Sequence, residues 1–100
     1  MATYTKSRSL HATLTGGSAD SVTLGGPGPL DMIEVKNRDS TAFIYFRVDG
    51  TPATVAGDNT YVVGPNEALT VDYVGGNAAS IISASSIAYS ATFVRGTASV

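Results

Sequence analysis

The chain has 100 residues, 14% of them charged, and a formal net charge of −2. That length predicts one domain with a modest core, and the charge excludes a dedicated nucleic-acid binder, which shows a basic patch or stripe. The chain has no cysteine, which excludes a disulfide framework and thiolate zinc sites and favours assembly in a reducing cytosol. No stretch approaches the roughly 20 apolar residues of a membrane helix.

The first nine residues, MATYTKSRS, are polar and have no hydrophobic period. We therefore expect a flexible N-terminal arm over residues 1–9, followed by one β-sandwich domain over residues 10–100. Terminal segments of this kind commonly fray. The alternative is an arm that becomes ordered on a partner, with Tyr4 as an anchor and Lys6 and Arg8 as charge contacts.

Short runs rich in Val, Ile, Thr, Tyr and Phe alternate with turn signals such as Gly-Gly, Pro-Gly-Pro, Asp-Gly and Gly-Pro-Asn. This pattern predicts an all-β fold, a small antiparallel β-sandwich or barrel of about eight short strands. A helix over residues 77–94 is disfavoured because side-chain size alternates with period two from Ile87 onward. The expected strands are His11–Thr15, Ser21–Leu24, Met32–Lys36, Ala42–Val48, Thr60–Val63, Ala68–Tyr73, Ser80–Ser83 and Ile87–Val94.

The stretch from residue 32 to residue 48 is predicted to be a hairpin that turns through residues 37–40. One register places Ile33 opposite Ile44 and keeps two charged side chains out of the core. A shift by one residue would bury those charges, so the first register is favoured. The face assigned to the core then carries Ile33, Val35, Ala42, Ile44, Phe46 and Val48.

The opposite face of this hairpin is unusual for a surface in open solvent. It combines methionine, two aromatic residues and arginine, which are enriched in protein interfaces. The alternative is that a terminal segment of the same chain covers this face. The predicted protein interface comprises Met32, Phe43, Tyr45 and Arg47, together with Tyr4, Lys6 and Arg8 of the arm.

Residues able to carry out chemistry are sparse. His11 is the single histidine, and we expect it to be structural or exposed. No G-x-S-x-G motif surrounds a serine. We predict no catalytic residue, cofactor or metal, and hence a protein that is not an enzyme. Asp49 and Asp58 lie in turn sequences, and a calcium site built from them and loop carbonyls is an alternative.

A sugar-binding module is a second alternative, because such modules are often β-sandwiches. The rings of Tyr45 and Tyr61 are candidates for sugar contacts. Tyr73 and Tyr89 fall at expected core positions, and the chain has no tryptophan.

The segment IEVKNRDSTAFIYFRVDGTPATVAGDNTYVVGPNEALTV resembles a recurrent type of small protein in tailed double-stranded DNA bacteriophages. In that pattern, turn motifs flank an aromatic strand, and a Y-S-x-T strand ends the chain. The matching residues are Asn37-Arg38-Asp39, Asp49-Gly50-Thr51, Gly57-Asp58-Asn59-Thr60-Tyr61-Val62 and Tyr89-Ser90-Ala91-Thr92.

The resemblance implies a non-enzymatic virion structural protein, first of all a capsid decoration (cement) protein on the outer head surface. Its expected partner is the major capsid protein, with no nucleic acid and no membrane. We expect a homo-oligomer located in the virion and assembled in the host cytoplasm, and both a trimer and one monomer per capsomer stay open. A neck or tail accessory protein and a glycan-binding module on the virion are the alternatives.

Overall fold

The structure is a computed structural model that describes residues 2–22, 32–72 and 79–98, and the side chains of residues 9–22, 32–72 and 79–94. Every regular element in these residues is a strand, so the predicted all-β fold with about eight strands is confirmed. None of the described residues forms a helix that could span a membrane. The strands are β1 (Ala2–Thr13), β2 (Asp20–Val22), β3 (Met32–Asn37), β4 (Ile44–Arg47), β5 (Tyr61–Val63), β6 (Ala68–Asp72), β7 (Ala79–Ile82) and β8 (Ala88–Ala98).

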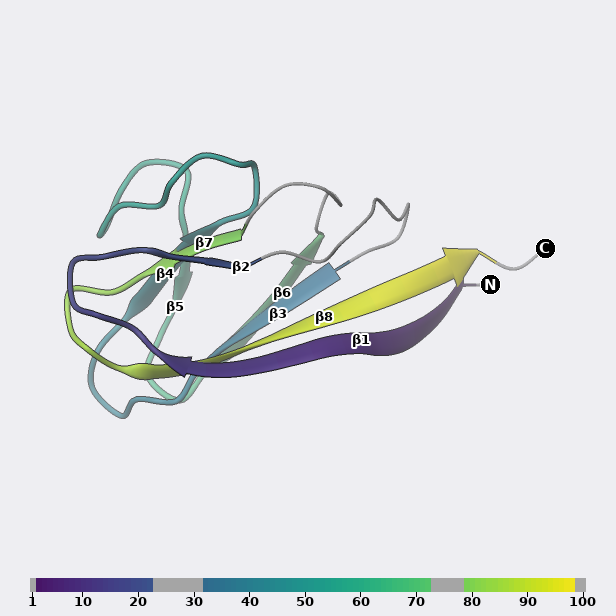
Figure 1. The fold of residues 1–100 in the computed structure, drawn as a ribbon, viewed down its shortest axis with the longest axis horizontal. Coiled ribbons are helices and arrows are strands. Elements are labelled where there is room, and N and C mark those ends of the chain that lie inside the picture. The colour runs from purple at the N-terminus through teal and green to yellow at the C-terminus, as the bar shows by residue number, and fades with distance from the viewer. Residues whose placement is uncertain (1, 23–31, 73–78, 99–100) are drawn as a thin grey trace.

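The strands pair as a set of nested hairpins, all antiparallel. β1 pairs with β8, β2 with β7, β3 with β6 and β4 with β5. The first sheet has the order β1-β8-β3-β6, and the second has the order β2-β7-β4-β5. The chain is therefore one long hairpin whose arms roll up together into two facing layers (Figure 1). This is the jelly-roll, or double-stranded β-helix, topology.

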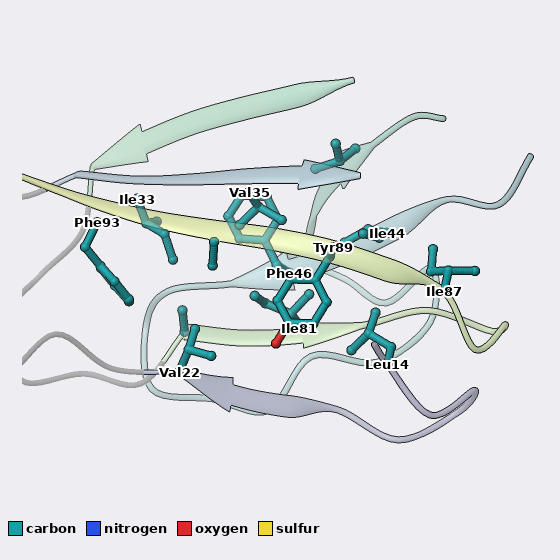
Figure 2. Packing of buried hydrophobic residues seen from close by; sticks show 13 residues of the cluster. Leu14, Val22, Ile33, Val35, Ile44, Phe46, Ile81, Ile87, Tyr89 and Phe93 are labelled. Carbon is teal, nitrogen blue, oxygen red and sulfur yellow. The ribbon is translucent and has the colours of Figure 1, made fainter. Parts of the chain in front are cut away.

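The core lies between the two sheets and is filled by side chains from both (Figure 2). Tyr89, Phe46 and Phe93 are its largest fully buried members. Burying a large apolar side chain contributes about 1.5–3 kcal/mol, so these rings hold the sheets together. The predicted inward face is confirmed. Its fully buried members are Ile33, Val35, Ile44 and Phe46. Its other two members, Ala42 and Val48, are partly buried against the core.

The predicted hairpin between residues 32 and 48 is wrong. β3 lies in the first sheet between β6 and β8, whereas β4 lies in the second sheet between β5 and β7. Ile33 therefore has Val71 and Phe93 as its register partners, not Ile44. The alternation of side chains determines which face of a strand is buried, but it leaves open which strand is the neighbour.

The buried side chain of Asn37 holds the corner where the chain leaves β3 for β4. Its Nδ2 donates to the carbonyl oxygen of Ala42 at 2.7 Å and to that of Val63 at 3.2 Å, and its Oδ1 accepts from the amide of Asp39 at 2.9 Å. The carboxylate of Asp39 in turn accepts from the amides of Thr41 and Ala42, and these bonds lower the pKa of Asp39. The side-chain amide of Asn37 therefore joins the end of β3 to the crossover and to β5.

Residues 2–9, predicted as part of a flexible arm, lie in β1. The backbone of β1 pairs with β8 from Ala2 opposite Ala98 to Thr13 opposite Ala88, with a register shift between Lys6 and Arg8. Residues 2–9 have no local pattern that predicts a strand. Their strand state depends on pairing with β8, which is distant in sequence. Residue 1 lies outside the described residues, as do Tyr73 and residues 23–24 of two other predicted strands.

The hydroxyl of the buried Tyr89 forms a hydrogen bond between the two sheets. It donates to Oδ2 of Asp20 at 2.8 Å and so links β8 of the first sheet to β2 of the second. Burial, followed by this hydrogen bond, raises the pKa of Tyr89 well above its ordinary value.

We expect the Asn37→Ala variant to lose roughly 2–4 kcal/mol of unfolding free energy, because the carbonyls of Ala42 and Val63 lose their donor. Asn37→Asp should lose at least as much, since a carboxylate cannot donate to a carbonyl. Urea unfolding measures both. Asn59→Gly is the matched control: Asn59 is exposed and has a left-handed backbone with φ of 62°, which glycine adopts readily. A loss below about 1 kcal/mol in Asn37→Ala would contradict this role.

We also expect stability to fall as the pH rises above about 10, where a tyrosine in the unfolded chain ionises. The folded state keeps the Tyr89 proton to a higher pH, so it binds more protons than the unfolded state and loses stability as the pH rises. Tyr89→Phe should lose about 1 kcal/mol at neutral pH and show a shallower alkaline decline. Urea midpoints between neutral pH and pH ~11 measure both slopes. Equal slopes in the two proteins would refute the assignment.

Candidate functional sites

The chain's own loop of residues 48–60 lies against the part of the second sheet's outer face around Arg47 and Ser80. Ser80 of β7 points outward, yet it is buried, and its Oγ accepts from the amide of Ala53 at 2.8 Å. Ala53 is itself buried. The chain itself therefore covers part of the outer face of β4.

Arg47 fastens this loop to the sheet. Its Nε donates to Oδ1 of Asp49 at 3.1 Å, its Nη2 pairs with the other carboxylate oxygen, and its Nη1 donates to the carbonyl of Asp58 at 3.3 Å. The hydrogen bond from Arg47, followed by that from the Thr51 amide, lowers the pKa of Asp49 to about 2. The predicted interface residue Arg47 is thus engaged inside its own chain.

The calcium alternative finds no support in the part of the chain that the structure describes. Of its two proposed aspartates, Asp49 pairs with a guanidinium, and Asp58 offers that guanidinium its backbone carbonyl. No group of three or more His, Cys, Asp or Glu residues lies close enough there to hold a metal ion.

Another part of the second sheet's outer face carries an apolar patch made of Phe43, Tyr45 and Val62. Phe43 is 48% exposed and Val62 is 52% exposed. Tyr45 is half-buried and lies in register between Val62 of β5 and Ile82 of β7. The patch adjoins β5, which is an edge strand. Exposed apolar side chains next to an open strand edge favour a protein contact.

The predicted interface residues do not form one surface. Met32 belongs to β3 in the first sheet, whereas Tyr45 and Arg47 belong to β4 in the second, with Phe43 just before it. Because the two sheets face each other, their outer faces point in opposite directions. Tyr4, Lys6 and Arg8 lie in β1 at the positions opposite Gly96, Val94 and Phe93; their side chains lie outside the described part.

The tyrosines of the sugar-binding alternative are also dispersed. Tyr89 is buried in the core. Tyr61 is the register partner of the inward Phe46, and their ring centroids are 5.2 Å apart, whereas Tyr45 pairs with the outward Val62. Tyr45 and Tyr61 therefore point to opposite faces of the second sheet and form no common platform. Tyr73 lies outside the described residues.

The outer face of the first sheet is polar and carries an open groove of about 440 Å³. Three neighbouring strands, β1, β8 and β3, line it, together with Arg38 just after β3. His11 lies here; its Nδ1 is 2.6 Å from Oγ of Ser90. The groove could not be recognised from the sequence, because its residues come together only through the pairing of β1 and β3 with β8. Its lining residues are Ser9, His11, Glu34, Lys36, Arg38, Ser90 and Thr92.

The comparisons with known proteins show the fold alone. No family model matches the chain, and no curated protein matches it. Among solved structures, the chain is similar to a de novo designed double-stranded β-helix determined by solution NMR, with a TM-score of 0.54 and 15% sequence identity. That similarity covers 91% of this chain and 100% of the design. It agrees with the nested strand pairing and carries no information on function.

We expect Phe43→Ala to change the unfolding free energy by less than about 1 kcal/mol, because the side chain lies on the surface. Phe46→Ala should cost roughly 3–5 kcal/mol, because it opens a cavity in the core. The two variants delete the same side chain from opposite faces of one segment. Urea unfolding compares them, and similar losses would mean that the chain itself covers Phe43.

Proposed function

We propose that this protein is a non-enzymatic structural protein of a bacteriophage virion that decorates the outer surface of the head by binding the major capsid protein. The proposed class, virion structural proteins, rests on the sequence resemblance to small phage proteins. A neck or tail accessory protein is the alternative within that class. The jelly-roll topology is compatible with both, since it recurs in viral capsid domains and also in lectins and cupins.

The observation that carries the proposal is the ribbon of β1 and β8, which extends beyond the rest of the first sheet (Figure 1). β3 pairs with β8 only from Asn37 opposite Tyr89 to Met32 opposite Val94. β1 continues along β8 as far as Ala2 opposite Ala98. Within the described residues, the pairs from Ala2–Ala98 to Thr5–Arg95 therefore form a two-stranded ribbon without a third strand. We call this segment the terminal ribbon.

The terminal ribbon is suited to protein attachment for two reasons. An isolated two-stranded ribbon is at best marginally stable in water, so contact with a partner stabilises it. Its two strands also offer backbone donors and acceptors to a neighbouring strand, which is how extended segments add to sheets. The ribbon includes Tyr4, a predicted interface residue, and Lys6 follows directly opposite Val94. Decoration through such a ribbon gains strength from many copies on one shell.

The copy number per particle tests the proposal. Quantitative mass spectrometry of purified virions should find this chain in an amount comparable to the major capsid protein. An amount matching a single ring at one vertex would instead favour the neck or tail alternative. Absence from virions would overturn both. Light scattering of the purified protein determines whether it is the expected homo-oligomer.

Removal of the terminal ribbon tests the attachment. A variant without residues 2–5 and 95–98 keeps all pairs of β3 with β8 and β6, so it should fold but no longer co-sediment with capsids stripped of the protein. The control is Phe43→Ser, which leaves the ribbon intact and alters the apolar patch. Unchanged co-sedimentation of the truncated chain would refute attachment through the ribbon. Loss with Phe43→Ser alone would assign attachment to the patch.

A further inference from the structure

The groove on the first sheet arises from the lengths of the side chains on three adjacent strands. The central strand β8 contributes the short Ser90 and Thr92. In register, Ser90 lies between His11 of β1 and Lys36 of β3, and Thr92 lies next to Glu34. Long side chains on the flanking strands therefore form walls beside a floor of hydroxyl groups.

The polar groups of the floor are held in place. Oγ of Ser9 lies 2.9 Å from Oγ1 of Thr92, and Nδ1 of His11 lies 2.6 Å from Oγ of Ser90. Ser90 is also buried. Because each hydroxyl has a cross-strand partner, the hydroxyls of the floor and the imidazole are ordered before any ligand arrives, which lowers the entropic cost of binding.

The charges at the groove are not neutralised by ion pairs. In the described residues, the single ion pair is Arg47 with Asp49, on the other sheet, so neither Lys36 nor Arg38 has a carboxylate within 4.0 Å. Glu34 adds one carboxylate to the same wall as Lys36. The groove thus combines two free cations, an acceptor and several groups that both donate and accept hydrogen bonds.

We propose that this groove binds a carboxylate-bearing saccharide. The ligand carboxylate pairs with Lys36 and Arg38, and its hydroxyls bond to Glu34 and to the floor. A volume of about 440 Å³ lies in the range of small-molecule sites. Among the described residues that line the groove there is no Phe, Tyr or Trp, so charge and hydrogen bonds, rather than stacking on such rings, provide recognition. A single acidic side chain of a peptide would use the cations but leave the hydroxyl floor without a partner.

This activity is independent of attachment to a capsid and uses a different part of the molecule. The groove lies over β1, β8 and β3 where the three strands pair, whereas the terminal ribbon lies beyond β3. Failure of the decoration proposal would therefore leave saccharide binding unaffected, and the reverse also holds.

The test is titration of the full chain with an oligogalacturonate, the matched neutral galactose oligomer, a polyglutamate peptide and inorganic phosphate. Calorimetry gives the affinity, and amide NMR shifts give the location. Oligogalacturonate should bind with shifts centred on His11, Ser90 and Thr92, and binding should weaken with added salt. Lys36→Met and Arg38→Gln should each weaken binding roughly tenfold or more, because each removes a charge-assisted contact.

Arg47→Gln is the charge-matched control, since it removes a positive charge from the opposite sheet; it should bind oligogalacturonate like the parent chain. Four results would overturn the proposal. They are no binding of oligogalacturonate at millimolar concentration, equal binding of the neutral oligomer, equal or tighter binding of polyglutamate or phosphate, and shifts located away from the groove. The polyglutamate result would reassign the groove to an acidic protein partner, and the phosphate result would make it a general anion site.

Discussion

The buried amide of Asn37 is the interaction on which the arrangement of the two sheets depends. It stands at the end of β3, where the chain leaves the first sheet, and donates to carbonyls on the crossover and on β5. The backbone amide of Asn37 donates to the carbonyl of Glu67, just before β6. One residue thus joins the nearby crossover to β5 and to the segment just before β6, both of which are distant from it in sequence. Buried backbone polar groups are almost always paired, and this side chain supplies a partner to two carbonyls at the crossover and on β5.

The two outer faces of the sandwich differ because, among the described residues, a loop covers part of the second sheet and none comparably covers the first. On the second sheet, the loop of residues 48–60 folds back and is held by Arg47, Asp49 and Ser80, while the patch around Phe43 stays exposed. On the first sheet, nothing in the described residues comparably overlies the strands, and their outer face is polar. The apolar patch and the polar groove therefore lie on opposite sides of the molecule and can serve separate partners.

The strand positions and the inward face were predictable from local patterns. Alternation along residues 32–36 and 42–48 identified Ile33, Val35, Ile44 and Phe46 as core residues, because burial on one face imposes a period of two. Turn residues located most strand ends within a few positions. β1 was the exception: its residues 2–9 are polar, and their strand state rests on pairing with β8, at the other end of the chain.

The candidate sites were less accessible from the sequence. Residue types singled out Phe43, Tyr45 and Arg47, yet type alone could not reveal that Arg47 closes a loop while Phe43 stays exposed. The groove residues carried no motif, since Ser9, His11, Lys36 and Thr92 are scattered along the chain. They become neighbours only in the register of β1 and β3 with β8.

The sequence by itself determined an all-β chain, the approximate strands and the side chains that face inward, because each of these follows from the local alternation and turn chemistry. The tertiary structure decided which strands are neighbours. The AFIYFRV segment illustrates the division: its inward residues were clear, but its partners are β5 and β7 and not β3. Strand pairing depends on contacts between residues far apart in sequence, and a period of two looks the same beside any neighbour.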